Sequence, residues 1–169
     1  NLPGYSEPKR GDIVVFISPY QPDEAALGND PTPTLVKRLM GIPGDTLYMR
    51  DGLLHVNGIA QRQGFAAANN EKGNPNEVSE LFDWQKRVAL TSSRFGPAPV
   101  QPTHDNWGPL LVPPGHLLTM GDNRYQSVDG RYYGFAPLAN VRGRPLFIYF
   151  SFDMQDWKLR FDRFFTAIR

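Results

Sequence analysis

Glycine and proline punctuate this sequence densely and divide most of it into short runs. The 169-residue chain contains sixteen of each, and they follow no internal repeat. Such punctuation is typical of short strands joined by turns. Asp51-Gly52 is a preferred pair for a two-residue hairpin, and Asn57-Gly58 marks another turn directly after it. The sequence therefore predicts a mainly β, antiparallel fold.

Apolar and β-branched runs between these turns predict the strands themselves. The predicted strands cover residues 12–17, 34–40, 46–50, 53–56, 117–120 and 145–152. Residues 18–33 are rich in Pro, Asp and Gly and are expected to form a loop. The tail from Asp156 alternates aromatic and basic residues, a pattern that fits either a strand or a short helix.

A change of composition near Gln61 marks a predicted insertion. Residues 61–75 are small and polar, after which Asn74 is a candidate helix cap and Pro75 suits a first helical turn. Glu77 lies three residues after that cap. Apolar residues continue at near-helical spacing: Val78, Leu81, Phe82 and Val88. We therefore expect a helix from about 75 to 91.

These patterns divide the chain into a β core and a cap. The core comprises residues 1–60 and 108–169, and the small mixed α/β insertion comprises 61–107. The apolar fraction of 40% is that of a globular protein. The sequence starts without Met and in what looks like a loop, so we expect it to be a piece of a longer protein.

Charge and cysteine content exclude several classes of function. The net charge is +1, from 18 basic and 17 acidic side chains, and nucleic-acid binding is not expected from such a balance. The chain has no Cys, which excludes disulfides, thiolate nucleophiles and Cys-ligated zinc. No run of 18 apolar residues occurs, so the sequence predicts neither a membrane span nor a cleavable targeting segment.

Two adjacent cations interrupt the apolar strand predicted at 34–40. Side chains alternate between the faces of a strand, so Lys37 shares a face with Leu35 and Leu39, and Arg38 shares the other with Val36 and Met40. One cation is thereby directed towards the apolar side. Desolvation lowers the pKa of a lysine, and a neutral amine is a competent general base. The alternative is an edge strand from which both cations reach water.

The three histidines do not form a recognisable centre. His55, His104 and His116 have no partners at metal-ligand spacing, and no H-E-x-x-H or G-x-S-x-G element occurs. Neither a metal site nor a Ser-His-Asp hydrolase is predicted. His55 lies in a predicted hairpin and His104 in the polar insertion, so both are expected at the surface.

Residues 121–135, GDNRYQSVDGRYYGF, concentrate polar groups in one predicted loop. Asp122 and Asp129 lie close in sequence to Arg124 and Arg131, and nearby cations keep carboxylates ionised. Salt-bridged scaffolding is therefore favoured over acid–base work by these carboxylates. Ser127 is the one hydroxyl nucleophile candidate in the loop, although loop serines usually bond to their own backbone.

Three segments in this order resemble the type I signal peptidases, the bacterial leader peptidases of the serine–lysine class. They are KRGDIVVF (9–16), VKRLMGIPGDTL (36–47) and GDNRYQSVDGRYYGF (121–135). The match continues in LLHVNG (53–58), VPPGHLLTMGDNR (112–124) and NVRGRPLFIYFSFD (140–153). It covers most of the chain outside 18–33 and 61–107. The resemblance implies an antiparallel, partly barrel-like β core with residues 61–107 as its cap.

The resemblance also implies a role for each matched residue. Lys37 corresponds to the general base, and Ser127 to the residue whose hydroxyl orients the lysine amine. The implied supporting residues are Arg38, Asp122, Arg124, Asp129 and Arg131. No metal or organic cofactor is implied. The crowded loop would then serve to hold one amine in position.

One departure concerns the nucleophile. In the resembling family it is a Ser in an S-M-x-P-T box upstream of the RGDIVVF segment, and this sequence has no such box. Ser6 and Ser18 do not match it. We expect the nucleophile, the oxyanion-hole donors and the membrane anchor to lie outside this chain, so that the chain alone would be inactive.

The resemblance implies an extracytoplasmic serine endopeptidase at the cell membrane that cleaves signal peptides of secreted preproteins. Its partners would be extended peptides with small residues at the cleavage site. Three alternatives stay open at the level of sequence. They are a repressor-type serine–lysine autoprotease, a catalytically inactive relative that only binds peptides, and an enzyme in which Ser127 itself is the nucleophile.

Overall fold

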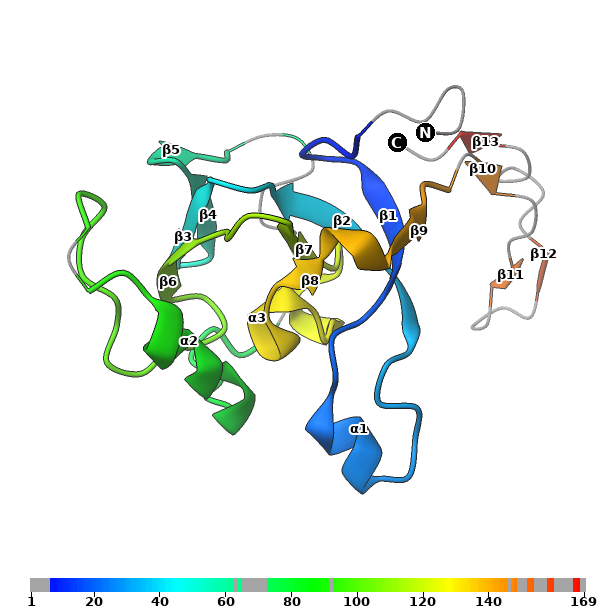
Figure 1. Ribbon diagram of the computed structural model, residues 1–169, viewed down its shortest axis with the longest axis horizontal. Helices are drawn as coiled ribbons and strands as arrows, with labels where there is room; N and C mark the ends of the chain where they lie inside the picture. The colour runs from blue at the N-terminus through cyan, green and yellow to red at the C-terminus, as the bar shows by residue number, and fades with distance from the viewer. Residues whose placement is uncertain are drawn as a thin grey trace.

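The computed structural model describes residues 7–62, 64, 73–91 and 93–145, together with the backbone of four short strands beyond them (Figure 1). These four strands pair antiparallel in twos, β10 (Phe147–Ile148) with β13 (Thr166–Ala167) and β11 (Phe152–Asp153) with β12 (Lys158–Leu159). The predicted strand at 145–152 and the undecided tail therefore fall partly outside the described residues.

Two larger antiparallel sheets make up the body of the molecule (Figure 1). A five-stranded sheet has the order β8 (Ala136–Pro137), β7 (His116–Met120), β2 (Thr34–Gly41), β1 (Ile13–Ile17), β9 (Val141–Gly143). A four-stranded sheet has the order β5 (Ile59–Ala60), β4 (Leu53–Val56), β3 (Thr46–Arg50), β6 (Trp107–Leu111). The mainly β, antiparallel prediction is confirmed. Within the described residues neither sheet closes into a barrel.

The two predicted turns have the backbone that their residues favour. Asp51 and Gly52 have φ angles of 49° and 74°, and Asn57 and Gly58 have φ angles of 54° and 87°. Positive φ at both central residues is characteristic of the type I′ turn, whose twist matches that of paired strands. Arg50 consequently pairs with Leu53 directly across the first turn.

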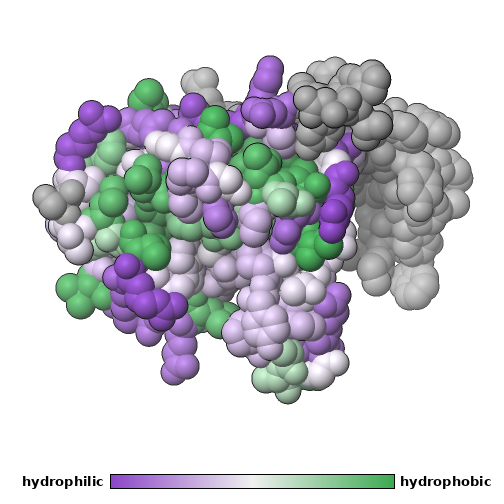
Figure 2. Space-filling view, viewed as in Figure 1, coloured by the Kyte–Doolittle hydropathy of each residue, from purple (hydrophilic) through white to green (hydrophobic). Residues whose placement is uncertain are grey.

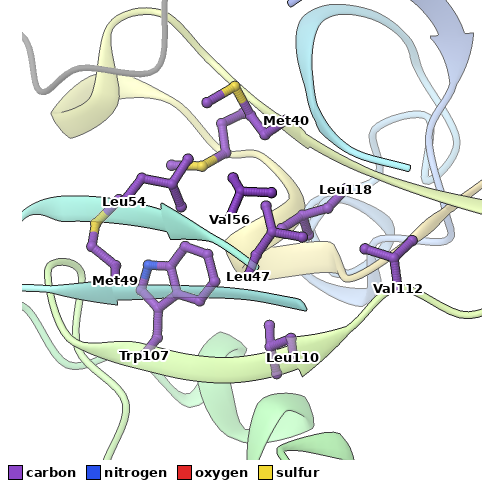
Figure 3. Packing of buried hydrophobic residues seen from close by; sticks show 10 residues of the cluster. Met40, Leu47, Met49, Leu54, Val56, Trp107, Leu110, Val112 and Leu118 are labelled. Carbon is purple, nitrogen blue, oxygen red and sulfur yellow. The ribbon is translucent and has the colours of Figure 1, made fainter. Parts of the chain in front are cut away.

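The main apolar core joins residues of both sheets (Figure 3). Trp107 and Leu110 of β6 contribute to the same cluster as Met40 of β2 and Leu118 of β7. The cluster also contains Leu47, Met49, Leu54, Val56, Val112 and Met120. Burial of these side chains stabilises the contact between the sheets by roughly 25 cal/mol for each Å² removed from water.

A second apolar cluster covers the other face of the five-stranded sheet. Its buried members are Val14, Phe16, Leu39, Leu117 and Ala136. Leu39 and Met40 are neighbours on β2 but belong to different clusters, as strand alternation requires. Both faces of β2 are therefore apolar at its second half, and a charged side chain on this strand needs a specific partner.

The helix in the insertion is shorter than predicted. A 3₁₀ turn, η2 (Glu80–Phe82), leads into α2 (Asp83–Val88). Asn74 instead closes a local turn, in which its Oδ1 accepts a hydrogen bond from the Asn76 amide. The residue that caps η2 is Ser79, whose Oγ accepts from the Leu81 amide. The helix ends early because Ala89 adopts an extended backbone and bridges to Leu110.

Other differences concern short elements. The loop predicted at 18–33 contains a one-turn helix, α1 (Pro22–Ala26), with Pro22 in its first turn. Strand β6 was not predicted, because Gly108 and Pro109 interrupt its apolar run. The polar loop contains η3 (Arg124–Gln126) and α3 (Gly130–Tyr133), and η4 (Leu138–Asn140) follows β8. Among the described helices, none has the length and apolar character of a bilayer span.

Candidate active site

The strand that carries Lys37 and Arg38 lies in the middle of its sheet. β2 pairs with β1 on one side, where Val14 lies opposite Lys37, and with β7 on the other, where Met120 lies opposite Arg38. The alternative of an edge strand with both cations in water is therefore wrong. Only 8% of Arg38 is exposed, and Lys37 is half-buried.

Lys37 projects from β2 towards the polar loop and contacts Ser127. Its Nζ lies 2.7 Å from Ser127 Oγ, a hydrogen bond between residues from distant parts of the sequence. Ser127 is itself buried and lies between η3 and α3. Val14, which lies opposite Lys37 on β1, belongs to the apolar cluster that includes Leu39.

The surroundings of Lys37 lower its pKa. Burial has the largest effect, because a desolvated ammonium is less stable than a desolvated neutral amine. The Arg131 guanidinium lowers the pKa further, whereas the Asp129 carboxylate opposes this trend. The neutral form of the amine is therefore populated at lower pH than in an ordinary lysine, and a neutral amine can accept a proton.

Gly121, the residue after β7, permits the close approach of amine and hydroxyl. A Cβ at this position would lie 2.1 Å from Ser127 Oγ and 3.7 Å from Lys37 Nζ. Real Cβ atoms do not approach other heavy atoms as closely as the first of these distances. Any larger residue at 121 must therefore displace Ser127.

Asp129 connects Gly121, at the start of the polar loop, with Arg131 in α3. Its side chain is fully buried and accepts hydrogen bonds from the Gly121 amide at 2.9 Å and from Arg131 Nε and Nη2 at 2.9 and 2.8 Å. Asp129 also caps α3 through the Arg131 amide. A buried ion pair with several hydrogen bonds fixes both of its partners, and here it fixes the segment that carries Ser127.

Arg38 holds the loop from the opposite face of β2. Its Nε and Nη2 donate to the two carboxylate oxygens of Asp122 at 2.7 and 2.6 Å, and its Nη1 donates to the Gly11 carbonyl at 2.8 Å. The hydrogen bond from Arg38 lowers the pKa of Asp122. Arg124, which is also buried, donates to the Gly121 carbonyl at 3.0 Å. The structure thus brings together at the polar loop all seven residues that the resemblance implied.

His104 was predicted at the surface, and this prediction was wrong. Only 1% of the residue is exposed. Both ring nitrogens have polar partners inside the molecule, and the ring stacks on Tyr125 at a centroid distance of 4.3 Å. Sequence reasoning missed this residue because its neighbours are polar. The adjacent Asp105 was the one available signal of a buried partner. His55 is partly exposed and stacks on Tyr48.

A pocket of about 170 Å³ opens between β1, β2 and the start of the polar loop. It is lined by Ile13, Val36, Lys37, Arg38, Gly121 and Asp122. Val36 is 57% exposed at this position. On the face seen in Figure 2, apolar and polar side chains are intermixed. Within the described part of the chain, no three acidic or histidine side chains are grouped closely enough to hold a metal ion.

Comparison with known proteins agrees with the resemblance seen in the sequence. A family model described as signal peptidase, peptidase S26, matches residues 2–150. A signal peptidase I of Rickettsia typhi is 32% identical over 159 residues, which cover 89% of this chain and 55% of that protein. A signal peptidase I of Bacillus licheniformis is 30% identical over 146 residues, which cover 86% of this chain and 61% of that protein.

Among solved structures, a signal peptidase I of Enterococcus faecalis matches with a TM-score of 0.49 and 28% identity, over 84% of this chain and 99% of that one. The sequence matches place the chain among the peptidases. It belongs to the signal peptidase family, peptidase S26. The chain spans little more than half the length of the Rickettsia and Bacillus relatives.

Proposed function

We propose that this chain forms most of the catalytic domain of a signal peptidase I, which cleaves signal peptides from secreted preproteins. Family membership supports the reaction class. The observation that carries the proposal is the 2.7 Å contact between Lys37 Nζ and Ser127 Oγ, at a half-buried position that lowers the lysine pKa. An amine in this state is suited to remove a proton from an alcohol.

In this proposal Lys37 is the general base and Ser127 orients it. The neutral amine takes the proton of a serine supplied from outside this chain, and the serine oxygen forms a bond to the scissile carbonyl carbon. The lysine ammonium then protonates the leaving amine as the peptide bond breaks, which leaves an acyl-enzyme ester. Water hydrolyses that ester, with the same lysine accepting the proton of the attacking water.

The remaining residues of the site hold Lys37 and Ser127 in place. Asp129 and Arg131 fix the loop through their buried pair, and Arg38 and Asp122 fix it to β2. A displacement of a catalytic group by about 1 Å can cost on the order of a hundredfold in rate. This sensitivity explains why so many hydrogen bonds converge on one loop.

The substrate would be an extended peptide with small side chains next to the scissile bond. An extended segment can add to a sheet through backbone hydrogen bonds. We place the domain on the extracytoplasmic face of the cell membrane, with the anchor outside this chain.

The test compares two polypeptides on a preprotein with an A-x-A-like cleavage site. One is the 169-residue chain, and the other is the protein as its host makes it, including any residues before Asn1. We expect cleavage only by the second, and Lys37→Ala should abolish it. Ser127→Ala should reduce kcat by about a hundredfold. Lys86→Ala, on the surface of α2, is the matched control and should retain activity.

Two results would overturn parts of this proposal. Failure of the host-made protein to cleave any preprotein would favour a relative that only binds peptides. Cleavage by the 169-residue chain, lost in Ser127→Ala, would make Ser127 the nucleophile instead of an orienting residue.

A further inference from the structure

The predicted insertion contacts one residue of the polar loop from two sides. Trp84 Nε1 and Gln85 Nε2, both on α2, donate to the carbonyl oxygen of Arg131 at 3.0 Å each. His104, from the end of the insertion, meets the guanidinium group of the same residue. Arg131 is thus held at its backbone and at its side chain by a segment that lies outside the matched motifs.

His104 Nε2 lies close to two groups of the polar loop, the Arg131 guanidinium and the Arg124 carbonyl. Arg131 Nη1 lies 2.5 Å from His104 Nε2, and a guanidinium nitrogen can only donate. On the other side of the ring, Nδ1 lies 2.6 Å from Asp105 Oδ1. The Arg124 carbonyl, 2.7 Å from Nε2, accepts a further hydrogen bond from Arg131 Nη2 at 2.5 Å.

Two further groups hold the imidazole in this orientation. Tyr125 stacks on its face with an interplanar angle of 15°, and the Tyr125 hydroxyl donates to Asp105 Oδ2 at 2.7 Å. The hydrogen bond to Asp105 raises the pKa of Tyr125 to about 12, so the hydroxyl stays protonated as a donor. These contacts fix the direction of the imidazole, with Nε2 facing Arg131.

A continuous series of contacts connects this histidine with the amine of Lys37. Arg131 donates to Asp129 through Nε and Nη2. Asp129 accepts from the Gly121 amide, and Gly121 packs directly against Ser127. Ser127 in turn receives the hydrogen bond of Lys37. Every side chain in this series is buried or half-buried, so each is held by its neighbours and not by water.

We propose that His104 is a positioning residue for Lys37, and that the insertion fixes the base through the contact of His104 Nε2 with Arg131. This inference rests on the proposed role of Lys37 as the base. It assigns to residues 73–107 a part in the reaction that the matched motifs do not contain. A purely structural His104 would contribute stability only, and the chemical state of Lys37 would not depend on it.

The experiment measures the pKa of Lys37 by NMR titration of the 169-residue chain, with labelled lysine side chains assigned through Lys37→Arg. His104→Phe keeps the ring and its stacking but removes both nitrogens. His104→Asn keeps a donor near Asp105 but does not reach Arg131. His104→Gln keeps a polar group near the position of Nε2. The control is His55→Phe, because His55 also stacks on a tyrosine, in the other sheet.

We expect the Lys37 pKa to shift upward, towards its ordinary value, in His104→Phe and His104→Asn, because a loosened loop admits water to the amine. His104→Gln and His55→Phe should keep the wild-type value. Thermal unfolding of each variant is measured in parallel, because a structural role would change the melting temperature alone. In the host-made protein, His104→Phe should lower kcat on the order of tenfold to a hundredfold at unchanged KM.

An unchanged Lys37 pKa in folded His104→Phe and His104→Asn would overturn the proposal. Equal shifts in these two variants and in His104→Gln would also contradict it, because the polar group that faces Arg131 would then be irrelevant. Where His104→Phe does not fold, His104→Asn decides in the same way. If Lys37 of the wild type already has the pKa of an ordinary lysine, the proposed function fails instead, and this outcome needs no histidine variant.

Discussion

Lys37 Nζ and Ser127 Oγ lie 2.7 Å apart although 90 residues separate them in the sequence. The contact exists because β2, which carries the lysine, pairs with β7, after which the polar loop begins. Neither side chain needs to be unusual in itself. The sheet brings the strand and the loop together, and the buried Asp129–Arg131 pair fixes the loop at the required distance.

Replacement of Gly121 tests the close approach to Ser127. The Cβ of Gly121→Ala would lie 2.1 Å from Ser127 Oγ, so the loop must shift. We expect the free energy of unfolding to fall by about 2 kcal/mol and the Lys37 pKa to rise towards its ordinary value. Gly143→Ala is the control, because no atom lies within 4 Å of its added Cβ. Equal stabilities of the two variants in denaturant titrations would contradict the contact.

The buried ion pair of the loop makes Asp129→Asn strongly destabilising. The substitution keeps the shape of the side chain but leaves the Arg131 charge unpaired where neither residue is exposed to water. Loss of one partner of such a pair costs about 3 kcal/mol in the free energy of unfolding. Chemical denaturation at neutral pH measures this loss. Asp83→Asn, in an exposed pair with Lys86, is the comparison and should change stability little.

The pair of Arg38 and Asp122 predicts one component of acid sensitivity. Arg38 lowers the pKa of Asp122 in the folded state below its unfolded value of about 3.9. The contribution of the Arg38–Asp122 pair to the free energy of unfolding is therefore complete above the unfolded pKa of Asp122. It is lost as the pH falls through the lowered pKa of the folded state. The side chain of Asp122 is 58% exposed, so Asp122→Asn should cost no more than about 1 kcal/mol at pH 7. The same cost at pH 2 and pH 7 would refute this assignment.

Lys37→Met is expected to stabilise the protein at neutral pH. Because the pKa of Lys37 is lowered in the folded state, the unfolded chain binds a proton at this amine more tightly than the folded protein does. The free energy of unfolding of the wild type therefore rises with pH between the lowered pKa and about 10.4. The variant lacks this dependence. It should exceed the wild type by about 1 kcal/mol at pH 7, and the gap should narrow towards pH 10.5. Lys86→Met controls for the loss of a surface lysine. A gap that is constant with pH would contradict burial of the amine.

Turn residues and apolar runs predicted the parts of the fold that local chemistry determines. The hairpin at Asp51-Gly52 is an example, because positive φ is a property of these residues themselves. Strand β6 was missed because its interruption by Gly108 and Pro109 is tolerated only through pairing with β3, which local sequence does not reveal. The helix start at Asn74 was misplaced, because Asn74 closes a local turn and Ser79 caps η2 instead.

The site divides in the same way. Lys37 could be recognised as a charged residue within an apolar strand. The polar loop could be recognised because it concentrates polar residues in a short segment. His104 did not, because its burial depends on partners from three places in the chain, Asp105, Tyr125 and Arg131. Long-range polar networks of this kind leave no periodic pattern in a sequence.

A titration of the Lys37 amine in the wild-type 169-residue chain tests its role as a base most directly. The chain has five lysines, and NMR of labelled lysine side chains resolves them individually. We predict that Lys37 loses its proton at a lower pH than an ordinary lysine does, and that Gly121→Ala removes the difference. A Lys37 pKa at or above the ordinary value of about 10.4 would show that this amine is not prepared to act as a base.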